Sequence, residues 1–63
     1  MLEYTKTILH KVSLSPALFG KELTKSLKWL PKNEAYLLMT WCIITFGDLY
    51  PEIIREASRG AGF

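Results

Sequence analysis

The chain has 63 residues, 49% of them hydrophobic, and a formal net charge of +2. This length allows a single domain, and the hydrophobic content is too high for intrinsic disorder over most of the chain. A lone cysteine excludes an intrachain disulfide, and one cysteine with one histidine cannot form a four-ligand zinc site. Self-association or a partner is therefore the remaining ordinary way to stabilise so small a core.

Apolar residues at helical spacing predict a first helix over residues 2–12. They are Leu2, Thr5, Ile8, Leu9 and Val12. The same stretch lacks the continuous apolar run of a secretory signal, which favours a cytoplasmic protein with a reduced, buried Cys42. His10 falls on the polar face of this helix, where we expect an ordinary surface histidine.

A second helix is predicted over residues 16–30. Ser15 is suited to cap it, and Pro16 is suited to its first position, where a missing N–H costs nothing. Pro31 ends it by disfavouring the α conformation at the residue before. On a helical wheel one side of this segment forms a core stripe of Phe19, Leu23, Leu27 and Leu30.

The opposite side of the second helix is basic, with Lys21, Lys25, Lys28 and Lys32. We interpret this lysine face first as a solvated surface that maintains solubility. The alternative is a phosphate-contacting face for nucleic acid or an anionic membrane surface. Trp29 lies beside it; we expect the first helix to cover this ring, the alternative being that it stacks on a base.

A further side of the second helix carries only small residues, Ala17, Gly20 and Thr24. Glycine inside a helix costs about 1 kcal/mol relative to alanine. Either the site merely tolerates glycine, or a neighbouring backbone packs closely against it. Both explanations stand at this point.

A third helix is predicted over residues 34–46, with Asn33 as its N-cap. Beyond it the apolar spacing continues through Gly47. Either one helix runs to Ser58 with a kink near Gly47, or a fourth helix over residues 49–58 begins with Asp48 as its cap. We favour the break, because glycine followed by aspartate supplies a stop and a start. Residues 59–63 are expected to form a flexible tail.

The segment from Ala35 to Phe46 is apolar on every side. A helix of this length spans about 18 Å, too short for the roughly 30 Å of a bilayer core, so no membrane span is expected. One side, with Leu37, Trp41 and Ile44, can pack on the first two helices. The other side then needs a cover of its own.

That other side is our predicted interface for self-association or a partner protein. Together with the segment that follows, it comprises Met39, Cys42, Ile43, Phe46, Tyr50 and Ile53. The alternative is that the C-terminal segment folds back and covers this side within the same chain.

Charge distribution favours pairing of two copies. Residues 1–32 hold six lysines and two acids, a balance of +4, whereas residues 33–63 hold two arginines and four acids, a balance of −2. Opposite ends of two antiparallel copies would attract, and a two-fold homodimer is the commonest assembly.

No residue pattern indicates catalysis, a metal or a cofactor. Catalysis requires converging groups in a pocket, and no such set occurs here. Glu52 and Glu56 alternate with Arg55 and Arg59, as on an ordinary solvent face. The glycines near the C-terminus do not form a phosphate loop. We therefore expect a protein that is not an enzyme.

Three runs resemble a class of short, all-helical bacterial proteins of unknown function: FGKELTKSLKWL, LLMTWCIITFGDLY and EII. The resemblance covers about two thirds of the chain and implies a small cytoplasmic bacterial protein, without implying an activity. Our prediction is an all-α bundle of three to four short helices that self-associates, most simply as a homodimer, and acts as an interaction module or accessory subunit. The alternative is a small nucleic-acid-binding protein that uses the lysine face.

Overall fold

The structure, a computed structural model, describes residues 2–60 and residue 62. Four helices account for most of this part of the chain: α1 (Leu2–Val12), α2 (Pro16–Trp29), α3 (Lys32–Phe46) and α4 (Pro51–Gly60). No strand occurs among the described residues. The predicted all-α fold is therefore confirmed, with four helices rather than three.

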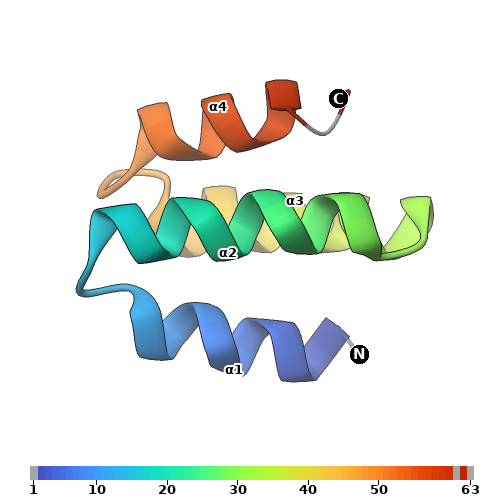
Figure 1. Cartoon of the computed structure of the whole chain (residues 1–63), viewed down its shortest axis with the longest axis horizontal. Helices are drawn as coiled ribbons and strands as arrows, with labels where there is room; N and C mark the ends of the chain where they lie inside the picture. Colours follow the sequence, from blue (N-terminus) through green and yellow to red (C-terminus); the bar gives the residue numbers. More distant parts are fainter. Residues whose placement is uncertain (1, 61, 63) are drawn as a thin grey trace.

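The helices form a small bundle in which each runs roughly opposite to the one before it (Figure 1). α2 and α3 lie side by side at the centre, while α1 and α4 flank this pair on opposite sides. The bundle measures 26 × 22 × 19 Å. Both central helices contact both flanking helices, so α2 and α3 supply most of the core.

The turn from α1 into α2 follows the expected proline chemistry. Ser15 takes an extended conformation, and its carbonyl oxygen accepts the N–H of Phe19 at 2.8 Å. Its side chain, however, makes no capping hydrogen bond, so Ser15 caps α2 through its backbone alone. At the other end Leu30 is extended because Pro31 follows it.

α3 begins two residues earlier than predicted, directly after Pro31. The N-cap position belongs to Pro31, whose carbonyl accepts the N–H of Ala35 at 2.8 Å, and not to Asn33. A proline can occupy the N-cap position when its ψ angle is extended, and the ψ angle of Pro31 is 151°. Asn33 is therefore an exposed first-turn residue.

The predicted break after α3 is confirmed, but Asp48 does not cap α4. Residues 47–49 form a turn, and α4 starts at Pro51 with the carbonyl of Tyr50 accepting the N–H of Ile54 at 3.1 Å. Proline at the first helical position loses no hydrogen bond, which places the start there. α4 also extends through Arg59 and Gly60, which were expected in the tail; residues 61 and 63 lie outside the described residues.

The core joins all four helices. α2 contributes its predicted stripe, Phe19, Leu23, Leu27 and Leu30, all buried. α1 adds Leu9, and the contributions of α3 and α4 are Ala35, Leu38, Met39, Cys42, Phe46, Ile54 and Ala57. The ring of Phe19 lies 4.9 Å from Phe46 and 5.0 Å from Tyr50, so an aromatic cluster closes one end.

The small side of α2 faces α4, which decides between the two explanations given for Gly20. A Cβ placed on Gly20 would lie 3.0 Å from Cγ2 of Ile53. Near the other end of α4, Thr24 Cγ2 would lie 3.7 Å from a Cβ placed on Gly60. This spacing favours close packing against α4 over mere tolerance of glycine, and the close neighbour is a side chain rather than a backbone.

Candidate interaction surfaces

The inner face of α3 holds three of the six side chains predicted as the interface. Cys42 is fully buried, and Met39 and Phe46 are nearly so. Tyr50 and Ile53 are half-buried, and only Ile43 is exposed. This differs from the surface position expected for them, because α4 folds back over this face, as the alternative interpretation had it.

The outer face of α3 combines residues from both predicted sides: Leu37 and Ile44 were expected to pack on α1 and α2, whereas Ile43 belonged to the predicted interface. We define it by its exposed residues Tyr36, Leu37, Thr40, Ile43 and Ile44. The four apolar members are between 55% and 79% exposed, with Ile44 the most exposed. The wheel placed Leu37 and Ile44 inward because both sides of this helix are equally apolar. Tyr36 was not singled out at all.

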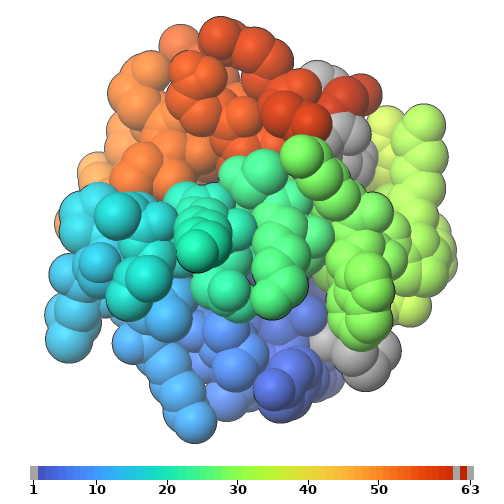
Figure 2. Space-filling view, in the orientation of Figure 1, coloured from blue at the N-terminus to red at the C-terminus, as the bar shows by residue number. Residues whose placement is uncertain are grey.

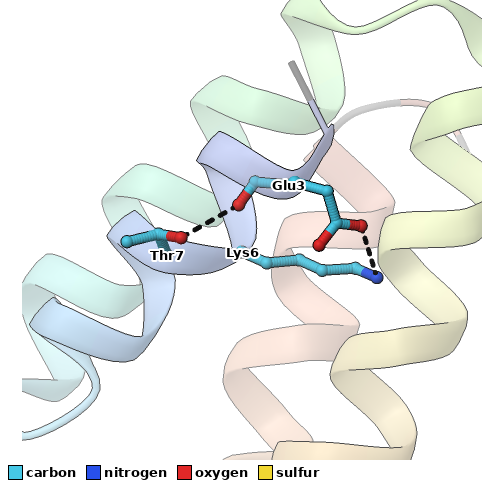
Figure 3. Close-up of polar contacts among 3 residues, drawn as sticks. All are labelled: Glu3, Lys6 and Thr7. Carbon is cyan, nitrogen blue, oxygen red and sulfur yellow. Dashed lines mark hydrogen bonds and ion pairs between the residues drawn. The ribbon is translucent and has the colours of Figure 1, made fainter.

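Trp41, the third member of that expected inward side, does contact α1. Its ring lies 5.3 Å from the ring of His10 and 5.5 Å from that of Phe46, and the ammonium of Lys6 stands 5.6 Å from it. Figure 3 shows Lys6 extended beside Glu3, whose carboxylate is 3.3 Å from Lys6 Nζ. The hydroxyl of Thr7 donates to the Glu3 carbonyl oxygen at 3.1 Å. Such exposed pairs within α1 contribute little to stability. The contact between α3 and α1 at this point is therefore mainly the packing of the Trp41 ring against His10 and Lys6.

Two exposed charges bound the outer face of α3, Lys32 at the start of the helix and Asp48 just beyond its end. Neither forms an ion pair within residues 2–60 and 62. The four ion pairs of this part of the chain are all local, at three-residue spacing within α1, α2 or α4. The outer face is thus an apolar strip with one positive and one negative end.

A second surface lies on the opposite side of the bundle, where α2 runs between α4 and α1 (Figure 2). It is a broad, open hollow of about 1350 Å³, lined by residues of these three helices. Lys21, Lys25 and Lys28 line it, but Lys32 does not. Three acids line it as well: Glu22, Glu52 and Glu56. The formal charges of the side chains that line this hollow therefore sum to zero, although its three lysines belong to the lysine face.

Trp29 also lines the hollow and is 67% exposed, so the expectation that α1 covers it is wrong. It is the last residue of α2, and the α1 residues that line the same hollow, Tyr4, Thr5 and Ile8, leave most of its ring exposed. The ring is available for contact on this side of the molecule.

The described residues offer little for chemistry. Burial among apolar side chains raises the pKa of the Cys42 thiol to about 12, which keeps it protonated and unreactive. No group of three His, Cys, Asp or Glu side chains in residues 2–60 and 62 gathers closely enough to hold a metal ion. In the same part of the chain, no helix has the length and apolar character needed to cross a membrane.

Comparisons with known proteins give this chain no relative: no protein-family model matches it, nor does any curated protein or solved structure. The class that the fold defines is a small all-α four-helix bundle. Among the surfaces of this bundle, the outer face of α3 carries four large, exposed apolar side chains.

Proposed function

We propose that this chain is a small helical interaction module or accessory subunit that forms a homodimer through the outer face of α3 and has no catalytic activity of its own. The observation that supports this is the exposure of Tyr36, Leu37, Ile43 and Ile44 together on one helix face. Contiguous exposed apolar residues on a small protein generally mark an interface. A second copy is the occupant we favour, because the face ends in opposite charges that two copies would satisfy.

The size of this face sets the expected affinity. An ordinary stable interface covers about 800 Å² per partner, roughly a fifth of the 4167 Å² that the chain exposes. A single helix of 15 residues is about 22 Å long and presents less than that area. We therefore expect a dissociation constant in the micromolar range rather than an obligate dimer.

Size-exclusion chromatography with multi-angle light scattering tests this proposal. Across about 1 µM to 500 µM protein, the mass should rise from 7.2 kDa toward twice that value. Circular dichroism at the lowest concentration should still report a helical monomer, because the core lies within one chain. A folded monomer of 7.2 kDa over the whole range would overturn the proposal.

We further propose a cytoplasmic setting. Cys42 is enclosed by the core, and its high pKa suits a thiol that stays reduced. Fractionation of the native cells should recover the chain together with cytoplasmic markers, and recovery in a membrane or secreted fraction would contradict this setting.

One observation favours a second function, binding of single-stranded nucleic acid on the α2 side. The exposed ring of Trp29 lies in the same hollow as Lys25 and Lys28, a combination on which a base could stack while phosphates meet ammonium groups. The three glutamates in this hollow argue against it, since they oppose phosphate.

A salt titration of oligonucleotide binding, followed by fluorescence anisotropy, decides this second function. Binding should weaken steeply with salt, and the double variant K25E/K28E should abolish it, whereas K11E on exposed α1 should leave it unchanged. Absence of binding at about 50 mM salt removes this function and leaves the first intact.

A further inference from the structure

We infer that two copies pair their α3 outer faces in antiparallel orientation about a two-fold axis at Thr40. This inference rests on the proposed self-association and adds its geometry. It specifies which residues of the two copies meet.

The outer face is symmetric in chemistry about Thr40. Tyr36 and Leu37 precede it by four and three residues, and Ile43 and Ile44 follow it by three and four. In an antiparallel pair centred on residue 40, positions at equal distances before and after it oppose each other. Tyr36 then meets Ile44 of the second copy, and Leu37 meets Ile43 of the second copy, so all four apolar side chains are covered.

Thr40 suits the crossing point, where the two helices approach most closely. Its hydroxyl already donates to the carbonyl oxygen of Tyr36 at 3.0 Å, so burial costs it no hydrogen bond. The side chain is small, which permits the interaxial distances of about 8–10 Å that helix packing favours. A larger residue at this position would hold the copies apart.

One turn further out, the chemistry of the face is complementary rather than identical. The exposed amide of Asn33 opposes Gly47 of the second copy, which has no side chain to obstruct it. Beyond them, Lys32 opposes Asp48 of the second copy, and this pair occurs twice in the dimer. A parallel dimer would instead place Lys32 beside Lys32 of the second copy, and Asp48 beside Asp48 of the second copy. The like charges of each pair would repel.

The other charge near this face does not change the preference. Arg55 of α4 lies in a shallow groove with Ile43, and its guanidinium is 3.7 Å from the carboxylate of Glu52, which compensates its charge locally. The dipoles of the two α3 helices also favour the antiparallel arrangement.

Cysteine cross-linking tests the axis position with a matched pair of exposed threonines on α3. Thr40→Cys should give a disulfide-linked dimer on mild oxidation, because facing Cα atoms at a helix crossing fall within the roughly 4.4–6.8 Å that a disulfide needs. Thr45→Cys lies off the outer face and should stay monomeric under the same conditions. Cys42 is buried and should not interfere. Cross-linking of the two variants at equal rates would overturn the axis.

Orientation is tested by two further cysteine variants. With a flexible bismaleimide reagent that bridges about 10 Å, Lys32→Cys and Asp48→Cys should cross-link to each other when mixed and not to themselves, since in the antiparallel pair two copies of residue 32 are about 24 Å apart. Self-cross-linking of Lys32→Cys as fast as the mixed reaction indicates a parallel dimer and overturns the inference.

Charge exchange gives an independent readout that needs no oxidation. Lys32→Asp and Asp48→Lys should each weaken dimerisation by about threefold to tenfold at low salt, and the double variant K32D/D48K should restore it. Failure of the double variant to restore dimerisation overturns the pairing. If light scattering instead shows that the native chain is monomeric throughout, the proposed self-association falls together with its geometry; if it shows a dimer, these variants judge the geometry alone.

Discussion

α2 and α3 occupy equivalent places at the centre of the bundle, yet their outward sides differ. α2 presents Lys21, Lys25 and Lys28 to solvent, mixed with the acids of its neighbours. α3 has no charged residue between Glu34 and Asp48 and presents a strip of apolar side chains instead. A helix that is apolar on one side is complete once that side is buried, whereas a helix that is apolar all round leaves a second side to be covered.

The largest expected effect is a difference in stability between variants of two adjacent leucines, Leu38 on the inner face of α3 and Leu37 on its outer face. Leu38→Ala removes a fully buried side chain and should lower the free energy of unfolding by about 2–5 kcal/mol, enough to unfold much of so small a domain. Leu37→Ala removes an exposed one and should change it by less than about 0.5 kcal/mol.

Urea denaturation followed by circular dichroism, at protein concentrations low enough for the monomer, measures both variants. Similar losses of stability in the two would mean that both faces of α3 are buried in the monomer.

The next effect concerns association rather than stability. Ile44→Lys places a charge on the most exposed residue of the outer face and should weaken dimerisation about a hundredfold, because two ammonium groups lose solvent and the apolar burial of two isoleucines is lost. Sedimentation velocity gives the dissociation constant. The comparison variant is Leu18→Lys, on α2, where the native leucine is about half exposed and no association is proposed. An equal effect of both variants would move the interface away from α3.

A third effect builds up gradually with pH and reports whether water reaches the inner face of α3. Burial raises the pKa of Cys42 from its ordinary value of 9.0 to about 12. Below pH 9 both folded and unfolded chains hold the proton, so the full stability is present. Above it the unfolded chain loses the proton first, and the free energy of unfolding should fall by about 1.4 kcal/mol per pH unit until about pH 12.

The variant Cys42→Ala isolates the contribution of the Cys42 thiol to the pH dependence of stability, since the lysines and tyrosines that titrate in the same range are present in both proteins. Its stability should decline less steeply with pH between 9 and 11 than that of the native chain. Identical slopes would show that water reaches the thiol.

The smallest effect concerns the contact that holds α4 over the inner face. The hydroxyl of Tyr50 donates to the carbonyl oxygen of Ser13 at 2.5 Å and joins the two turns at one end of the bundle. Tyr50→Phe keeps the ring against Phe19 but loses this bond, which should cost about 1 kcal/mol and lower Tm by about 4–8 °C. Tyr4→Phe, on an exposed ring, should leave Tm unchanged. Equal thermal melts for both variants would contradict a role for this bond.

Much of the fold could be predicted from local signals. Pro16, Pro31 and Gly47 mark the limits of the helices to within a few residues, and the stripe from Phe19 to Leu30 is buried as its spacing indicates. These predictions succeed because proline geometry and the contrast between leucine and lysine act within a few residues along the chain. The starts of α3 and α4 each differ by two residues from the prediction, and at α4 Asp48 and Pro51 both favour a helix start, so only the turn geometry decides between them.

The candidate site was the harder part for the same physical reason. In α2, charge distinguishes the outward side, so the sequence by itself determined which residues face the core. In α3, Leu37 and Leu38 are chemically identical, and only the positions of the other three helices decide which of them is buried. α4 reaches its position because Gly20 lets Ile53 approach closely and Tyr50 joins Ser13, both contacts between segments distant in sequence. The sequence thus determined that α3 has one apolar face too many, and the tertiary structure decided that Tyr36, Leu37, Ile43 and Ile44 form it.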